Sequence, residues 1–333
     1  MLIDASLPPA PLKSVPEIAR YAESLGFDAL WGSETMHDPF LAGGLAAEHT
    51  HRLAYGTAVA IAFSRSPGNL AYTAWDFAQL SAGRFILGLG TQVKAHIVRR
   101  FGMPWPASVV GQLREQILAV RALWNTWQSG ASLDFRGEYY KLNLMLPFFN
   151  PGAIEHPHIP IYIAGVNTGL ARLAGELADG FVVHPFHSPQ YLKQVLLPAI
   201  LAGAEKAGRT PAEIKISTTA FVVTTPEEDT FVRMQIAFYA STPSYRAVMA
   251  FHGWGDIAEQ LSPLARSGRW FEMPALISDE MLAAFAVVSD AESLPDRLKD
   301  RYHGVADRLG LYAPLAPGER DKFWERFVPA MRS

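Results

Sequence analysis

The 333-residue sequence has no cysteine, and this absence removes several kinds of chemistry at once. Without thiols, the chain cannot form disulfides, a thiolate nucleophile, a cysteine-ligated zinc site or a cysteine-ligated iron–sulfur cluster. Charged side chains are also scarce, at 18% of residues, and they nearly balance to a net charge of −3. No run of lysine and arginine marks a surface for nucleic acid or an anionic membrane, so neither partner is expected.

Long apolar runs are absent as well. No stretch of about 18 or more apolar residues escapes interruption by charge, Gly or Pro, so no transmembrane helix is predicted. The N-terminus lacks the basic start and apolar stretch of a signal peptide. We therefore expect a cytoplasmic protein. Its apolar content of 49% predicts a large buried core, and its aromatic residues leave room for a subunit interface.

Short apolar runs alternate with helical stretches along the chain, which predicts parallel strands joined by helices. Strands are predicted at residues 2–6, 28–32, 53–63, 85–90, 159–164, 180–184, 214–224 and 307–313. The clearest helix spans residues 107–127, where apolar side chains recur every three or four positions. These strands fit an α/β fold of one closed (β/α)₈ TIM barrel, a single domain over residues 1–333, better than two doubly wound domains.

Two segments interrupt the alternation. In residues 132–143, apolar and polar side chains alternate on both sides of a possible turn at Arg136 and Gly137, which predicts a hairpin insertion. Residues 240–282 mix Pro and Gly with aromatic side chains, which indicates an insertion of short helices and loops. We expect both insertions to cover the C-terminal mouth of the barrel. The aromatic residues that could roof an apolar pocket there are Phe238, Tyr239, Tyr245, Phe251, Trp254, Trp270 and Phe271.

Candidate acid and base residues follow the predicted strands, because chemistry in such barrels sits at the C-terminal ends of the strands. Glu34 and His37 follow the second strand, although Ser33, Thr35 and Asp38 nearby could simply cap the next helix. His184, at the end of the sixth strand, is a further candidate that lines the pocket. No His-Glu-x-x-His motif, Walker loop or Gly-x-Ser-x-Gly elbow is present, so no protein-bound metal is predicted.

Three strand ends suggest how a ligand could be held. Residues 53–63 alternate small and bulky side chains, so one face is flat; it either carries a planar ligand or fills a tapered barrel interior. The fourth strand ends in Gly-x-Gly, but Val93 stands where a dinucleotide fingerprint needs a third glycine. Those glycines are therefore predicted to let a ligand approach the backbone. Residues 164–167 precede a helix. The N-terminus of this helix could bind a phosphate, or a side chain could cap it without any ligand.

Three blocks together resemble the luciferase-like monooxygenase superfamily. They read Tyr-Gly-Thr-Ala-Val at 55–59, Ala-Gln-Leu-Ser-Ala-Gly-Arg-Phe-Ile-Leu-Gly-Leu-Gly-Thr at 78–91 and Ile-Tyr-Ile-Ala-Gly at 161–165. The likeness is closest to the oxidoreductases that use the deazaflavin coenzyme F420, and it implies a barrel whose mouth takes up the deazaflavin ring. It also implies a homodimer and a cis peptide bond between Ala58 and Val59. The cofactor-binding residues that it implies are Glu34, Ala58, Val59, Gly90, Thr91, Ala164, Gly165, Val166 and Asn167.

The resemblance implies hydride transfer between a substrate carbon and C5 of the deazaflavin, with Glu34, His37 or His184 handling a proton. Related sugar-phosphate dehydrogenases carry histidine directly after the acid, where this chain has Thr35. A small apolar alcohol, aldehyde or enone is the expected substrate. Three alternatives stay open: an FMN-dependent monooxygenase of the same fold, a barrel lyase or isomerase without a redox cofactor, and a non-catalytic cofactor-binding or subunit protein.

Overall fold

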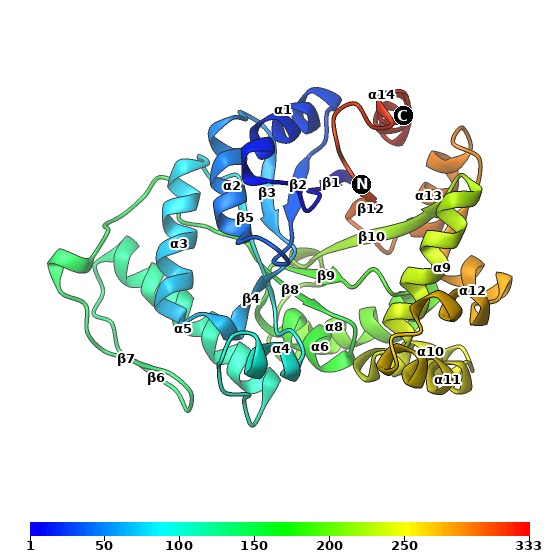
Figure 1. Cartoon of the computed structure of the whole chain (residues 1–333). Coiled ribbons are helices and arrows are strands. Elements are labelled where there is room, and N and C mark those ends of the chain that lie inside the picture. Colours follow the sequence, from blue (N-terminus) through cyan, green and yellow to red (C-terminus); the bar gives the residue numbers. More distant parts are fainter.

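The computed structural model describes all 333 residues, and its centre is a closed barrel of eight parallel strands (Figure 1). The ring closes because β12 pairs with β1 on one side and with β10 on the other. In chain order the barrel strands are β1 (Leu2–Ser6), β2 (Ala29–Gly32), β3 (Ala54–Thr57), β5 (Phe85–Gly90), β8 (Ile161–Gly165), β9 (Gly180–Val183), β10 (Lys215–Val223) and β12 (Arg308–Pro314). The predicted (β/α)₈ barrel is confirmed.

Helices cover the outside of the barrel. The longer ones are α1 (Val15–Leu25), α2 (Pro39–Glu48), α3 (Pro67–Leu80), α5 (Val109–Ser129), α6 (Thr168–Leu177), α8 (Leu197–Lys206), α9 (Pro226–Ala240), α13 (Leu294–Tyr302) and α14 (Asp321–Arg332). Their ends follow local rules: Ser108 caps α5 by accepting the N–H of Gly111, and Gly130 ends it with a φ of 76°. None of the helices has the length and apolar character needed to cross a membrane.

Short elements fill the connections. They are α4 (Lys94–Arg99), α7 (Pro189–Tyr191), a π-helical turn at Leu192–Leu196, and 3₁₀ turns at Leu12–Ser14, Ala62–Ser64, Pro147–Phe149, Pro211–Glu213, Pro243–Tyr245 and Trp270–Leu276. Two short strands lie beside the barrel: β4 (Ala60–Ile61) pairs with β5, and β11 (Ala286–Val288) pairs with β10. Neither β11 nor α4 stands out in the hydrophobic pattern, because each is only a few residues long.

The two insertions lie in different places. Residues 240–282 contribute α10 (Arg246–Phe251) and α11 (Gly255–Arg266), which together with α9 and α12 (Asp279–Phe285) form a lobe beside the barrel (Figure 1). The lobe reaches the mouth, where Asn167 donates to the carbonyl oxygen of Ser244 at 3.1 Å. The hairpin of β6 (Phe135–Arg136) and β7 (Lys141–Leu142) instead packs on α5, since Glu115 accepts three of its backbone N–H groups. The expectation that this hairpin covers the mouth is therefore wrong, because it covers α5. The turn of the hairpin begins after Arg136.

The barrel interior contains a buried charged pair beneath an aromatic layer. Asp4 and Arg308 form two hydrogen bonds of 2.8 Å each, and Trp31 Nε1 donates to the same carboxylate at 2.8 Å. The indole of Trp31 lies on Gly56, where a Cβ atom would come within 2.4 Å of the ring. The flat face of residues 53–63 is therefore filled by a tryptophan of the same chain, in agreement with the tapered-interior alternative.

Candidate active site

The end of β3 makes an irregular turn at the C-terminal mouth. The peptide bond between Ala58 and Val59 is cis, at the position to which the family resemblance points. The chain leaves the barrel at this bond, resumes pairing as β4 and then forms the 3₁₀ turn at Ala62–Ser64. Residues 53–63 are therefore not one strand, as the alternation predicted. Ala58 is only half-buried, so its inward side is open to the mouth.

The Gly-x-Gly end of β5 accommodates this turn. A Cβ atom on Gly88 would lie 1.8 Å from the backbone oxygen of Thr57, and one on Gly90 would lie 2.5 Å from Val59 Cγ2. Thr57 Oγ1 also donates to the carbonyl oxygen of Gly88 at 2.7 Å and accepts its N–H at 2.9 Å. The prediction that these glycines admit a ligand is therefore incomplete, because the neighbouring strand already occupies the space beside them.

We expect Gly88→Ala to destabilise the protein by about 1–3 kcal/mol even without any ligand, because its methyl group must displace the backbone of Thr57. Chemical denaturation of the purified protein measures this. Gly44→Ala is the matched control, since Gly44 lies in α2 with nothing within 4 Å of its Cβ position. Helix propensity predicts that the control gains up to about 1 kcal/mol. Unchanged stability in Gly88→Ala would leave ligand approach as the reason for the glycine.

Glu34 is held in an ion pair at the start of the β2–α2 loop. Its Oε2 accepts from Arg65 Nη1 at 2.6 Å and from the backbone N–H of Ile61 at 2.7 Å. Burial lowers the pKa of Arg65, but the ion pairs with Glu34 and Asp38 outweigh this effect and the net shift is upward. Glu34 thus connects the end of β2 to the segment that follows the cis bond. Sequence reasoning missed Arg65, whose residue type and spacing carry no recognisable signal.

The other side chains of this loop have mixed roles. Asp38 caps α2 by accepting the N–H of Phe40 at 2.8 Å, as the helix-cap alternative predicted. His37 is exposed, makes no hydrogen bond, and borders a small crevice between this loop and the loop after β1. Arg100 Nη2 donates to the carbonyl oxygen of Thr35 at 2.6 Å, which ties the loop to the segment after β5. No proton acceptor or donor positions His37 for catalysis.

His184 lies at the opposite wall of the mouth. It follows Gly180 and Val182 at two-residue intervals on the inward side of β9, where Gly180 packs against the ring of Tyr162. Its Nδ1 accepts the N–H of Phe186 at 3.1 Å. Burial, together with nearby His187, lowers the pKa of His184 to about 3. The ring is therefore neutral at physiological pH and carries its proton on Nε2.

The Nε2–H of His184 has no partner in the protein, and it is not sealed from solvent. The backbone that carries it is fixed from behind: His187 Nδ1 donates to the carbonyl oxygen of His184 at 2.9 Å, and Thr218 Oγ1 lies 3.0 Å from His187 Nε2. Burial lowers the pKa of His187 to about 4, so the imidazole of His187 is also uncharged at physiological pH. The site therefore presents a rigidly held hydrogen-bond donor to whatever enters the mouth.

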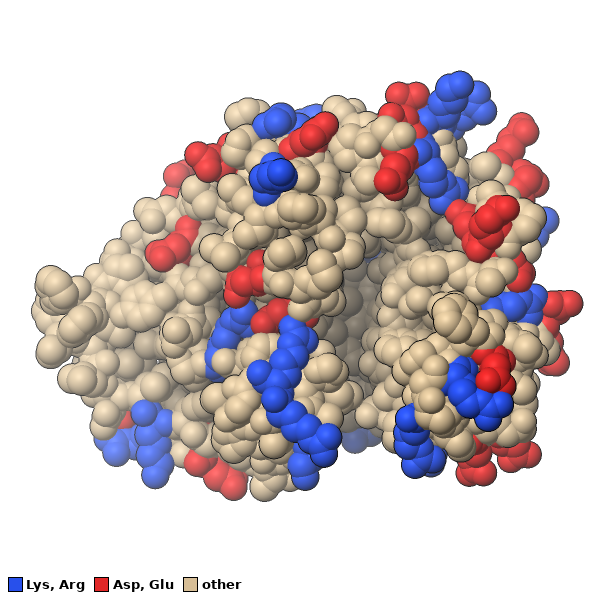
Figure 2. All heavy atoms as spheres, in the orientation of Figure 1, with Lys and Arg blue, Asp and Glu red and all other residues tan.

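Aromatic rings surround this donor. The rings of Tyr239 and Tyr245 lie 4.7 and 4.5 Å from that of His184, and the hydroxyl of Tyr239 is 2.9 Å from that of Tyr312. Burial raises the pKa values of Tyr239 and Tyr245, which keeps both phenols neutral. Figure 2 shows a hollow in the middle of this face, bounded by the lobe of α9–α12, with walls that are mostly uncharged.

Only part of the predicted aromatic roof lines the mouth. Tyr239 and Tyr245 do so, whereas Phe251 and Trp254 contribute to the core near Phe285. The remaining three, Phe238, Trp270 and Phe271, have between 40% and 90% of their surface exposed. Composition alone could not separate these groups, because aromatic residues in a core and in a pocket have the same sequence signature.

The end of β8 provides backbone groups for a phosphate. Ala164 and Gly165 are half-buried at the mouth. The side chain of Val166 lies in the core and its carbonyl accepts from Tyr191, so only its backbone can face a ligand. Asn167 precedes α6 without capping it, and its amide reaches the insertion instead. The first N–H groups of α6 are thus free of side-chain caps, as a phosphate site requires. Thr91 is half-buried at the end of neighbouring β5.

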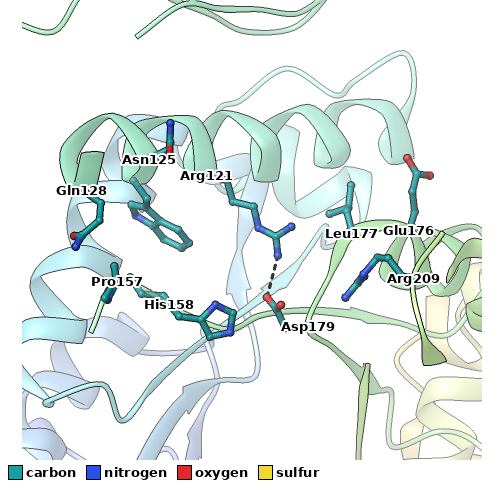
Figure 3. Close-up of a pocket in the computed structure, with 11 residues that line it drawn as sticks. Arg121, Asn125, Gln128, Pro157, His158, Glu176, Leu177, Asp179 and Arg209 are labelled. Carbon is teal, nitrogen blue, oxygen red and sulfur yellow. Dashed lines mark hydrogen bonds and ion pairs between the residues drawn. The ribbon is translucent and has the colours of Figure 1, made fainter. Parts of the chain in front are cut away.

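A pocket of about 540 Å³ lies at the other end of the barrel. It is bordered by residues that precede strands, among them His158 before β8 and Arg209 before β10 (Figure 3). Arg121 and Asp179 form an ion pair of 3.0 Å across it. Because barrel enzymes carry chemistry at the C-terminal face, this N-terminal cavity is not the candidate site. No three His, Asp or Glu side chains come together as a metal site anywhere in the chain.

The mouth geometry can be compared with known proteins. Residues 3–308 match the family described as luciferase-like monooxygenase. The chain belongs to the luciferase-like monooxygenase family. The three sequence blocks that resemble this family are therefore a correct identification, and the barrel with its irregular β3 end is the frame that the family resemblance implied.

Two relatives share most of the length of this chain. A protein of Mycobacterium bovis without an assigned function is 43% identical over 315 residues, which cover 92% of each chain. An F420-dependent glucose-6-phosphate dehydrogenase of Nakamurella multipartita is 29% identical over 95% of this chain and 92% of that protein.

The solved structures share the fold at lower sequence identity. The coenzyme F420-dependent tetrahydromethanopterin reductase of Methanopyrus kandleri has a TM-score of 0.80 at 20% identity, over 99% of this chain and 97% of that one. An F420-dependent secondary alcohol dehydrogenase, in complex with an F420–acetone adduct, has a TM-score of 0.75 at 20% identity, over 100% and 99% of the two chains. The chain thus has F420-dependent oxidoreductases among its homologues.

Proposed function

We propose that this protein is an F420-dependent oxidoreductase that transfers hydride between the deazaflavin and a small apolar alcohol, aldehyde or enone. The observation that carries the proposal is the mouth itself, where an unpartnered N–H of His184 stands among neutral aromatic rings. The uncapped start of α6 lies beside it, after neighbouring β8, and the half-buried Ala58 lies at the end of β3, two strands further round the barrel. F420-dependent dehydrogenases and reductases among the homologues support this reading.

The residues at the mouth fit a deazaflavin. Ala58, Val59 and Gly90 leave an uncharged surface against which a planar ring can lie, with Glu34 behind it. Thr91 would contact the ribityl chain, while Ala164, Gly165 and the backbone of Val166 and Asn167 would hold the phosphate at the uncapped start of α6. When bound, F420 supplies a carbon that accepts or gives a hydride.

The chain's own residues then orient the substrate. The neutral His184 imidazole would donate its Nε2–H to the substrate oxygen, which polarises a carbonyl during reduction and stabilises the alkoxide that forms. Water at the open mouth would then give the alkoxide its proton, and in the oxidising direction water would take the proton of the alcohol as the hydride leaves. Tyr239 and Tyr245 provide an apolar wall beside the donor, against which the carbon part of the substrate can pack. Glu34 forms an ion pair with Arg65 and accepts the N–H of Ile61, so both contacts hold the segment after the cis bond and we assign Glu34 a positioning role.

The substrate is expected to be uncharged. The rings that pack against His184 are those of the neutral Tyr239 and Tyr245, whereas a phosphorylated sugar needs lysine or arginine partners to replace its hydration. Apolar alcohols and ketones lose little hydration free energy when they enter an aromatic pocket. Their single oxygen can accept the hydrogen bond of the single unpartnered donor.

A parallel titration tests this function. Purified protein is titrated with F420 and with FMN while the fluorescence of each cofactor is followed, and turnover is then measured with alcohols, aldehydes, enones and sugar phosphates. We expect micromolar affinity for F420, weaker binding of FMN, and turnover of the apolar substrates. Rapid oxygen consumption with reduced FMN would identify a monooxygenase instead. Fast turnover of a sugar phosphate would overturn the substrate assignment, and binding of neither cofactor would overturn the proposed function.

A further inference from the structure

One basic segment at the rim of the mouth is not used by the chemistry described above. Lys94, His96, Arg99 and Arg100, in and directly after α4, are all exposed, and none of them forms an ion pair. Arg65, by contrast, binds both Glu34 and Asp38. Figure 2 shows a group of lysine and arginine side chains beside the hollow, where Figure 1 places α4.

The position of this basic segment is fixed relative to the cofactor site. Lys94 follows Thr91 by three residues, so α4 begins where the end of β5 leaves the mouth. Arg100, at the end of the segment, binds the β2–α2 loop through a 2.6 Å hydrogen bond to the carbonyl oxygen of Thr35. The buried Ile97 anchors the helix from below while the cationic side chains point to solvent.

This group of exposed cations is a local feature of the surface and not a consequence of a basic protein, because the overall net charge is −3. Neighbouring cations without acidic partners repel one another, and a polyanion relieves this repulsion while releasing counterions. Within a Debye length of about 8 Å in physiological salt, several such charges act together on one anionic chain.

We propose that Lys94, Arg99 and Arg100 bind the anionic tail of the deazaflavin cofactor, which carries a phosphodiester and a chain of glutamates beyond the ribityl group. This inference rests on the proposed function and extends it to the part of the cofactor that does no chemistry. The start of α6, which would hold the phosphate, follows β8, and β8 pairs with β5. Because α4 is the basic element that begins after β5, a tail that continues from this phosphate would reach it. FMN ends at its phosphate, so the segment also selects F420 over FMN.

The tail proposal is tested by binding and needs no turnover. Fluorescence titrations compare F420 carrying several glutamates with the deazaflavin riboside that lacks both phosphate and glutamates. They are run on the wild type, on Lys94→Ala/Arg99→Ala, and on the matched double variant Arg20→Ala/Arg52→Ala. Arg20 on α1 and Arg52 before β3 are exposed cations outside the mouth. Arg100 is left intact, because its bond to Thr35 also holds the loop.

We expect Lys94→Ala/Arg99→Ala to weaken F420 binding about 10-fold at low salt and to leave riboside binding unchanged, with a smaller difference at high salt. The Arg20→Ala/Arg52→Ala control should bind both ligands like the wild type. If the variant binds F420 as tightly as the wild type does, the tail proposal is wrong while the proposed function stands. If neither F420 nor the riboside binds the wild type, the proposed function itself is wrong.

Discussion

Replacing His184 by alanine is expected to lower kcat/KM by about 10²- to 10³-fold, the usual cost of removing one preorganised donor from a reacting oxygen. The expectation follows from geometry: Nδ1 is occupied by the N–H of Phe186, Nε2–H is free, and the backbone is held by His187. Steady-state kinetics with the best substrate of the panel measures the effect. The fold should be intact, because the side chain lies at the open mouth rather than in the core.

Two further variants separate donation from proton transfer. His184→Gln keeps an N–H at a similar reach and should recover part of the lost rate. Because the pKa of His184 is lowered to about 3, wild-type kcat/KM should show no inflection near pH 6.5 from this residue. His37→Ala should change the rate little. A large loss of kcat/KM in His37→Ala, together with a normal kcat/KM in His184→Ala, would contradict this assignment. It would show that the catalytic residue lies in the β2–α2 loop.

Replacing Asp4 by asparagine is expected to destabilise the fold by about 3–5 kcal/mol, because Arg308 then keeps a buried charge without a counter-ion. The two side chains are 2% and 9% exposed and share two hydrogen bonds inside the barrel. Asparagine still offers an oxygen to Trp31 Nε1, so the variant isolates the loss of charge. Urea unfolding measures the free energy directly.

An exposed ion pair supplies the matched control for this variant. Asp134 and Arg136 lie 2.7 Å apart, but 60% and 70% of their side-chain surfaces are in solvent. Asp134→Asn should therefore cost less than about 1 kcal/mol. A similar small loss in Asp4→Asn would show that water or a neutral Asp4 already relieves the buried charge, and the account of the barrel interior would be wrong.

The barrel could be predicted from sequence because its pattern is local and repeated. Apolar runs of strand length alternate with helical stripes, such as the one on α5 that buries Leu113, Ile117, Val120 and Trp124. Residues 53–63 were the exception. Their alternation continues through Ala58 and Val59, yet the strand ends there because the backbone turns away. A period of two in the side chains does not reveal a change in backbone direction.

The sequence predicts where the site residues lie, at the ends of strands, but not what each residue does. Parallel strands bring their C-terminal ends together, and in the structure Glu34, Thr91, Asn167 and His184 follow the ends of β2, β5, β8 and β9. Their roles depend on partners distant in sequence: Arg65 lies 31 positions from Glu34. The state of His184 likewise depends on the loop that bends its neighbour Phe186 back onto Nδ1. No spacing rule encodes such contacts. The homodimer and the cytoplasmic location stay predictions.

The most direct test of the central claim follows the hydride itself. A secondary alcohol deuterated at its carbinol carbon is incubated with the protein and F420, and the reduced cofactor is analysed by mass spectrometry. The account predicts that the deazaflavin gains one deuterium from the alcohol, that the alcohol becomes a ketone, and that no oxygen is consumed. Reduced cofactor without deuterium, or product formation that requires FMN and oxygen, would contradict it.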